Sequence, residues 1–378
     1  MEALGETVHR IYLIPGMFGF GRLAGYDYFG HVERALSRRF EDAGIRHVLE
    51  IVPTPPTASI RRRALVVAER IGSTAGPRDR LFLVGHSTGG LDARLLSSPS
   101  ASLAPSAPPA AWIRQIRRVV TINAPHHGTP LAGFFATVSG TRLLYALSLL
   151  TFTTLKVGGP PLTVFSGLVA ALGSVDEALG VDVKLLDGAT DLVLRFLGDR
   201  GRDEVRTWLD GIRRDQGGII QITPEAADLF NAAVEDSEDV EYGSIVTAAP
   251  APGPMRFAAG IRSPYAALSA TIFTTLYQIS SREYRDYPCP APDPAVARRV
   301  ELGLGRSVSG SDCDGVVPTL SMLWGRVLWA GAGDHLDIVG HFRGGRGSEH
   351  VDWLTSGAGF SRSDFGAVMD ALATFLLP

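Results

Sequence analysis

A G-x-S-x-G motif ends an uncharged apolar run in the segment Leu81-Phe82-Leu83-Val84-Gly85-His86-Ser87-Thr88-Gly89-Gly90, and a helix-compatible segment follows at residues 91–96. This order predicts a buried strand, a sharp turn that carries Ser87, and a helix, an arrangement known as a nucleophile elbow. The glycines suit a strained turn, because the strand and the helix must pass close to the serine. The simpler interpretation is a glycine-rich turn that happens to contain a serine.

Strand-like and helix-like segments alternate on either side of this turn. Apolar runs that predict buried strands lie at residues 10–14, 48–52, 81–86, 117–122, 240–248 and 327–330, and segments compatible with helices lie at residues 29–43, 59–73 and 364–377. Strands that alternate with helices favour a parallel sheet covered by helices. We therefore expect an α/β protein with a mostly parallel central sheet flanked by helices.

The alternation stops near residue 131. Residues 143–155 are uncharged and apolar but too short to span a bilayer, and Gly158-Gly159-Pro160-Pro161 would interrupt a spanning helix in the next apolar stretch. Residues 176–215 are charged and have apolar positions at helical spacing. We expect a core made of residues 1–130 and 216–378, with a helical lid or cap insertion at residues 131–215.

Three interpretations of this insertion remain open. It is a buried helical subdomain, a mobile apolar lid above an active site, or an interfacial anchor that touches a lipid surface. We expect no transmembrane segment, because no stretch is long and apolar enough without interruption.

Composition excludes some classes of function. The 378 residues are 45% hydrophobic and 20% charged, with a formal net charge of −3, which fits a globular protein and gives no electrostatic case for nucleic-acid binding. Cys289 and Cys313 cannot form a disulfide framework and are expected as free thiols or one bridge. Residues 1–6 carry acids where a secretory signal peptide needs basic residues, so we expect a cytoplasmic protein unless residues before Met1 supply a signal.

A serine nucleophile needs a base, and hydrolases with this elbow have the chain order serine, acid, histidine. His126 and His127 precede the late acidic residues and fail that order. His335 follows the last expected strand and a glycine-bearing turn, where catalytic groups collect in open α/β sheets. We therefore favour His335 as the base and expect His341 and His350 to lie in a solvated loop.

The acid is expected in the segment Ser311-Asp312-Cys313-Asp314-Gly315. Asp314 is favoured over Asp312, because Gly315 permits a tight turn that would aim a carboxylate inward. An ordinary Asp-Gly turn is the alternative, and the position of His335 after one further strand favours the catalytic interpretation.

Two backbone N–H groups are needed near Ser87 to bind a developing oxyanion. One belongs to Thr88, the residue after the nucleophile, and the second is expected from Met17 in the glycine-rich segment 15–21. A dinucleotide-binding loop is excluded here, since the spacing does not match G-x-G-x-x-G before a helix and no suitable acid follows.

Several motifs in the same order along the chain resemble the bacterial lipases of the α/β-hydrolase superfamily, in particular the Pseudomonas and Burkholderia triacylglycerol lipases. They are the oxyanion-loop segment 15–19, the elbow at 85–90, the string Thr121-Ile122-Asn123-Ala124-Pro125-His126-His127-Gly128-Thr129-Pro130, and the acid and histidine motifs Asp314-Gly315-Val316-Val317 and Asp334-His335-Leu336-Asp337. The resemblance is patchy but runs through most of the chain. Pro15 stands where these lipases usually have a histidine.

The resemblance implies Ser87 as the nucleophile, Asp314 as the orienting acid and His335 as the base. It also implies a structural calcium ion at Asp337, two residues after the histidine, with an exposed or helix-capping Asp337 as the alternative. No cofactor is expected to be required for catalysis.

The expected function is hydrolysis of carboxylic esters with hydrophobic acyl groups, through a Ser-His-Asp triad and an acyl-enzyme, as in a lipase or carboxylesterase. The apolar insertion favours a hydrophobic ester substrate and transient contact with a lipid interface. An intracellular polyester depolymerase or an acyltransferase would use the same triad. A non-catalytic hydrolase fold would instead bind lipid or a protein partner.

Overall fold

The computed structural model describes residues 7–101, 103, 111–157, 188, 190–191, 193–195, 197–253, 264–343 and 349–377. Its centre is a six-stranded sheet in the order β4-β1-β5-β6-β7-β8, in which neighbouring strands are parallel. The strands are β1 (His9–Ile14), β4 (His47–Ile51), β5 (Arg80–His86), β6 (Ile116–Ile122), β7 (Glu241–Ala248) and β8 (Arg326–Ala332). The expected parallel sheet is confirmed, and each predicted strand lies within two residues of its observed bounds.

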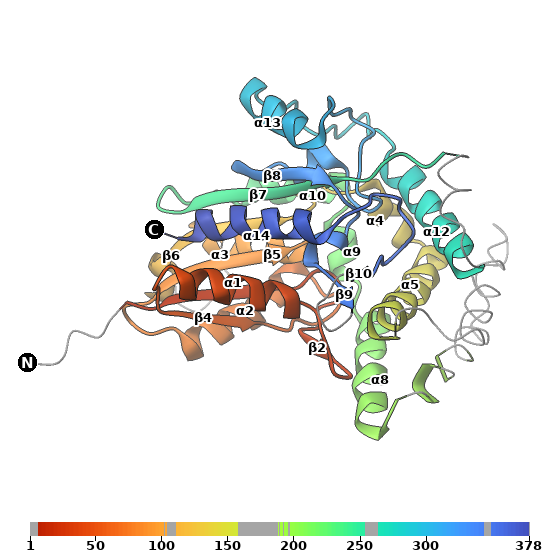
Figure 1. The fold of residues 1–378 in the computed structure, drawn as a ribbon, viewed down its shortest axis with the longest axis horizontal. Helices are drawn as coiled ribbons and strands as arrows, with labels where there is room; N and C mark the ends of the chain where they lie inside the picture. The colour runs from red at the N-terminus through yellow and green to blue at the C-terminus, as the bar shows by residue number, and fades with distance from the viewer. Residues whose placement is uncertain are drawn as a thin grey trace, which may run out of the picture.

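Successive residues of each strand face opposite sides of the sheet, so the strands bury two apolar layers. Leu13 of β1 joins the layer beneath α1 and α14, whereas Ile14 joins the layer beneath α2 and α3. The helices on the sheet are α1 (Gly30–Asp42), α2 (Ile60–Thr74), α3 (Thr88–Ser97), α13 (Pro294–Leu304) and α14 (Arg362–Leu376). Figure 1 shows α1 and α14 side by side against the sheet.

A further group of helices gathers at the end of the sheet where β5 and β8 finish (Figure 1). They are α4 (Pro130–Phe135), α5 (Val138–Val157), α8 (Asp199–Arg214), α9 (Gly217–Gln221) and α12 (Pro264–Ser280). Helix α10 (Pro224–Ala233) follows α9 and contacts it. Helix α4 contacts both α5 and α12. Helix α12 therefore packs with helices of the predicted insertion, although it lies outside residues 131–215.

Helix α5 contains the apolar stretch that the sequence left open to three interpretations. Every side chain from Leu144 to Phe152 is buried, as expected for a helix that is apolar on all sides. In this conformation the stretch lies inside the protein. Within the described parts of the chain, no helix has the length and hydropathy needed to cross a bilayer. Residues 158–187 of the predicted insertion lie outside the described residues, as does most of the loop expected at 97–111.

Candidate active site

Ser87 occupies the turn between β5 and α3. Its backbone has φ 54° and ψ −127°, a conformation that residues other than glycine rarely adopt, so the turn is strained. The strand and helix approach each other closely: a Cβ on Gly85 would lie 2.1 Å from the carbonyl oxygen of Gly89, and a Cβ on Gly89 would lie 2.3 Å from the carbonyl oxygen of Ile14. The geometry is that of the elbow predicted from the G-x-S-x-G motif.

The structure brings Ser87, His335 and Asp314 into one hydrogen-bonded line. Ser87 Oγ lies 2.9 Å from His335 Nε2, and His335 Nδ1 lies 2.6 Å from Asp314 Oδ2. All three residues are buried. A carboxylate oxygen accepts, so Nδ1 carries the imidazole proton and Nε2 is left to accept from the serine hydroxyl.

Backbone hydrogen bonds fix the position of Asp314. Its Oδ1 accepts from the N–H groups of Val316 and Val317 at 2.9 and 2.7 Å, and its carbonyl accepts from the N–H of His335 at 3.1 Å. Gly315 has φ 94°, in the region that glycine tolerates best, as the predicted tight turn requires. Asp312, the alternative acid, instead accepts two hydrogen bonds from the Arg306 guanidinium, at 2.6 Å to Oδ1 and 2.9 Å to Oδ2.

The predicted oxyanion donors lie beside the serine. A Cβ on Gly16 would lie 2.9 Å from Ser87 Cβ, so the loop that carries Met17 packs directly on the nucleophile. Thr88 is the first residue of α3, and its N–H has no acceptor within the helix. Among the described residues, no protein group accepts from the N–H of either Met17 or Thr88. Both donors are free to bind a ligand oxygen.

Arg63 of α2 holds this loop in place. Its guanidinium donates to the carbonyl of Pro15 at 2.6 Å and forms an ion pair with Asp92 of α3 at 2.8 Å, with both side chains fully buried. Burial raises the pKa of Asp92 to about 6, and the adjacent guanidinium opposes that rise. Sequence reasoning missed this pair, because nothing in either helix indicates that the two residues meet.

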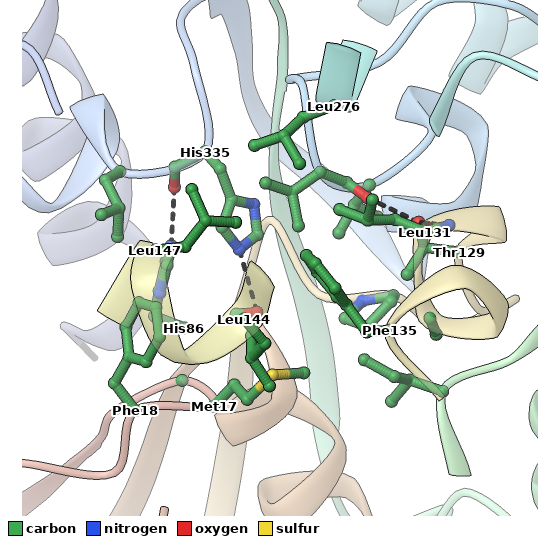
Figure 2. A pocket seen from close by; sticks show the side chains of 18 of the residues that line it. Met17, Phe18, His86, Thr129, Leu131, Phe135, Leu144, Leu147, Leu276 and His335 are labelled. Carbon is green, nitrogen blue, oxygen red and sulfur yellow. Dashed lines mark hydrogen bonds between the residues drawn. The ribbon is translucent and has the colours of Figure 1, made fainter. Parts of the chain in front are cut away.

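A small apolar cavity lies above Ser87. Its volume is about 60 Å³, enough for a few water molecules and well below the roughly 300–1,000 Å³ of ordinary ligand pockets. Figure 2 shows the side chains of Leu144, Leu147 and Leu276 around the His335 ring. Leu131 and Phe135 of α4 line the same space. Side chains of α4, α5 and α12 therefore line the cavity above Ser87.

Comparison with known proteins gives partial matches to bacterial lipases. No model of a known protein family matches the chain. In sequence, 127 residues are 28% identical to a triacylglycerol lipase of Vibrio cholerae, and 137 residues are 28% identical to a triacylglycerol lipase of Pseudomonas fragi. These matches cover 34% and 35% of this chain and 36% and 40% of the relatives. The chain thus spans well under half of the length of the lipases that it matches.

Solved structures of bacterial lipases share the architecture. The match to lipase 1 of Pelosinus fermentans has a TM-score of 0.51 at 16% identity and covers 97% of this chain and 99% of that lipase. The match to the Staphylococcus hyicus lipase has a TM-score of 0.51 at 14% identity and covers 97% of this chain and 95% of that lipase. The chain has the α/β-hydrolase fold. The sequence motifs indicated a resemblance to bacterial lipases and esterases. The shared fold confirms this resemblance.

Two histidines lie in an environment that differs from the one predicted from the sequence. His341 and His350 were expected in a solvated loop, and this prediction is wrong. His341 is 5% exposed and is bonded to Tyr26, and burial lowers its pKa to about 3. The ring of His350 packs between those of Phe342 and Phe360. Two aromatic side chains therefore cover the His350 ring, and local sequence does not reveal these contacts.

Asp337, which the resemblance linked to calcium, is also buried, so the exposed alternative is wrong. Its Oδ2 accepts from the N–H of Asp334 at 2.9 Å, and burial raises its pKa to about 8. The ligand atoms near it belong to His350 and Asp352. Calcium takes six to eight oxygen ligands, whereas this group offers a histidine nitrogen. Calcium sites also use backbone carbonyl oxygens and water, so the calcium ion at Asp337 stays a prediction.

Proposed function

We propose that the chain is a carboxylic ester hydrolase, a lipase or esterase that acts on esters of hydrophobic acyl groups. The observation that carries the proposal is the line from Ser87 Oγ through the His335 ring to Asp314, at the floor of an apolar cavity. Enzymes that transfer acyl groups use this arrangement: a nucleophile is hydrogen-bonded to a base, and a buried carboxylate orients the base. The partial sequence similarity to triacylglycerol lipases supports the same chemistry.

In the first half-reaction, His335 Nε2 takes the hydroxyl proton of Ser87 as Oγ attacks the ester carbonyl carbon. The N–H groups of Met17 and Thr88 stabilise the negative charge on the carbonyl oxygen. His335 then gives its proton to the leaving oxygen as the ester C–O bond breaks, so an alcohol departs and Ser87 carries the acyl group.

In the second half-reaction, a water molecule gives a proton to His335 as it attacks the acyl carbon. The proton passes to Ser87 Oγ when the acyl–serine bond breaks, and the carboxylic acid leaves. Asp314 holds the imidazole in the required tautomer and stabilises the imidazolium in both steps. These steps use side chains, backbone N–H groups and water alone.

Substrate binding requires the cap to move. A hydrophobic acyl chain does not fit a cavity of about 60 Å³, and α5 supplies Leu144 and Leu147 to its wall. We assign α5 as the lid, which leaves the core when substrate binds. Opening would expose its apolar side chains, and these would make the transient contact with a lipid interface that the sequence predicts.

The test is hydrolysis of p-nitrophenyl esters from acetate to laurate, with the wild type beside Ser87→Ala. A matched control is Ser73→Ala, which removes an exposed hydroxyl from α2. We expect turnover by the wild type and Ser73→Ala and none by Ser87→Ala. Retained turnover in Ser87→Ala contradicts the proposal, as does a wild type that neither turns over nor is labelled by a fluorophosphonate.

Two other activities would use the same triad: an acyltransferase differs from the proposed hydrolase in its acyl acceptor, and a polyester depolymerase differs in its substrate. An added alcohol that outcompetes water for the acyl-enzyme would assign an acyltransferase, and release of hydroxy-acid oligomers from an aliphatic polyester would assign a depolymerase. Both would keep Ser87, His335 and Asp314 in the same roles.

A further inference from the structure

The two peptide units that bind the Asp314 carboxylate are themselves held by hydroxyl groups. Oδ1 of Asp314 accepts from the N–H of Val316 at 2.9 Å and from the N–H of Val317 at 2.7 Å. The first N–H shares its peptide unit with the carbonyl of Gly315, and the second shares its unit with the carbonyl of Val316. A side-chain hydroxyl donates to each of these carbonyls.

Thr129 supplies one of the hydroxyls. Its Oγ1 donates to the carbonyl oxygen of Val316 at 2.5 Å, and Figure 2 shows this bond as the dashed line at Thr129. Oγ1 also accepts from the N–H of Leu131 at 3.3 Å, as the N-cap of α4. The backbone N–H of Thr129 donates to the carbonyl of Ile222 at 2.9 Å. Three hydrogen bonds therefore fix this residue beside the acid turn.

Ser280, the last residue of α12, supplies the other hydroxyl and is fully buried. Its Oγ lies 3.2 Å from the carbonyl oxygen of Gly315 and 3.1 Å from that of Val316, so its single proton serves both acceptors. The same helix packs on the turn, because a Cβ on Gly315 would lie 2.6 Å from the ring of Phe273. Helix α12 thus contacts the acid turn through a ring and a hydroxyl.

A hydroxyl that donates to a peptide carbonyl strengthens the N–H donor of the same peptide unit. The peptide group is conjugated, so charge drawn toward the oxygen leaves the N–H more positive. Both N–H groups here end on a carboxylate, and hydrogen bonds to an ionised acceptor are the strong ones. Two side chains from separate parts of the chain therefore act on the same pair of bonds.

These bonds decide which carboxylate oxygen meets the base. With Oδ1 bonded to two N–H groups, the carboxylate cannot rotate without breaking both, and Oδ2 stays 2.6 Å from His335 Nδ1. We propose that Thr129 and Ser280 are positioning residues that act on Asp314 through these two peptide units, a role that rests on the proposed function, in which Asp314 orients His335.

Both residues belong to helices that also line the cavity above Ser87. Thr129 caps α4, which carries Leu131 and Phe135, and Ser280 ends α12, which carries Leu276. The two helices therefore shape the space for the acyl group and hold the acid. Loss of either hydroxyl should lower kcat, whereas a change in the cavity wall should alter the preference for acyl chain length.

The experiment measures kcat and KM for one p-nitrophenyl ester. Thr129→Val keeps the shape of the side chain without the hydroxyl, and we expect kcat to fall about tenfold with little change in KM. Thr129→Ser, which retains a hydroxyl, should recover most of this loss. Thr223→Val is the matched control, because Thr223 caps α10 in the same way and its hydroxyl donates to Ile220, so kcat should stay unchanged.

A second background separates positioning from a merely structural role. If Thr129 acts through Asp314, Thr129→Val should have almost no effect on kcat once Asp314→Asn is present. An equal loss in both backgrounds would show that Thr129 acts elsewhere, and wild-type kcat in Thr129→Val/Ser280→Ala would overturn the inference. If melting curves show that Thr129→Val does not fold, Ser280→Ala takes its place in the same cycle.

The ring proton of His335 gives a readout that needs no substrate. A proton held between Nδ1 and a carboxylate resonates far downfield of amide protons, and its loss in His335→Ala identifies the signal. We expect Thr129→Val to move it upfield and Thr129→Ser to restore it, and an unmoved signal would reject the inference. A wild type that shows the signal but hydrolyses no ester would contradict the proposed function alone. A wild type that hydrolyses esters without the signal is decided by the kinetic cycle.

Discussion

His86 donates a hydrogen bond from Nε2 to the backbone carbonyl of His335, over 2.9 Å. Burial lowers the pKa of His86 well below its ordinary value, so the ring is neutral and Nδ1 must accept. The hydroxyl of Tyr28, 2.8 Å from Nδ1, is therefore the donor there. The residue before the proposed nucleophile thus holds the backbone of the proposed base.

Replacing His86 with phenylalanine should slow turnover without weakening substrate binding. The variant loses the bond to the His335 carbonyl, and a small displacement of the base should lower kcat about ten- to a hundredfold, with little change in KM. Steady-state kinetics on one ester checks this. His86→Gln, whose amide can still donate, should retain more activity, and equal loss in both variants would argue against a positioning role.

Asp314→Asn should lower kcat by about 10³–10⁴-fold while the protein stays folded. An amide in place of Oδ2 would donate to His335 Nδ1 and move the ring proton to Nε2, which then cannot accept from Ser87. Asp312→Asn is the matched control, since Asp312 is bonded to Arg306 and should leave kcat unchanged. Equal kinetics of the two variants would refute the assignment of the acid.

Arg63→Met should lower the free energy of unfolding by about 3–5 kcal/mol, because the buried carboxylate of Asp92 loses its partner. The double variant Arg63→Met/Asp92→Leu should regain most of that stability but not the activity, since no guanidinium then holds Pro15. Urea unfolding and ester kinetics on the three proteins separate the effects. Wild-type kcat in the double variant would show that the oxyanion loop needs no such support.

Leu276→Trp should shift substrate preference toward short acyl chains. Leu276 of α12 lines the cavity above Ser87, and a larger side chain would occupy space that a longer acyl chain needs. We expect the ratio of kcat/KM for hexanoate over acetate esters to fall about tenfold. Leu302→Trp on α13, where the side chain is 67% exposed, is the control that should leave the ratio unchanged.

The fold should lose stability as the pH falls below 6.5. Burial, followed by the charge of Arg94, lowers the pKa of His127 to about 4, whereas the unfolded chain binds that proton near pH 6.5. Stability from the neutral ring is present above pH 6.5 and declines as the pH falls toward 4. His127→Gln should reduce the loss between pH 7 and pH 5 by about 2 kcal/mol in urea unfolding. An unchanged loss would assign the acid sensitivity to other groups.

The sheet and the three residues of the proposed triad could be predicted from the sequence because each has a local signal. Buried parallel strands are continuous apolar runs between polar segments, and the G-x-S-x-G turn needs glycine at Gly85 and Gly89 to avoid backbone overlap. Asp314 and His335 follow from the chain order that the elbow implies.

The remaining parts of the site depend on contacts between distant segments. Leu276 lies more than a hundred residues beyond the α5 helix with which it lines the cavity, and the Arg63–Asp92 pair joins two helices. His350 looked solvated because it lies in a stretch rich in glycine and arginine, yet Phe342 and Phe360 bury it. No local periodicity carries such information.

The distance along the chain between Ser87 and His335 bears on how the protein is made. The two residues are 248 positions apart, and His335 follows β8, the last strand of the sheet in sequence and an edge strand in space. At about 5–20 residues per second, a ribosome needs roughly 12–50 seconds to pass from one to the other. Throughout that interval the nascent chain presents a serine of ordinary reactivity, and the proposed triad is complete only when β8 docks.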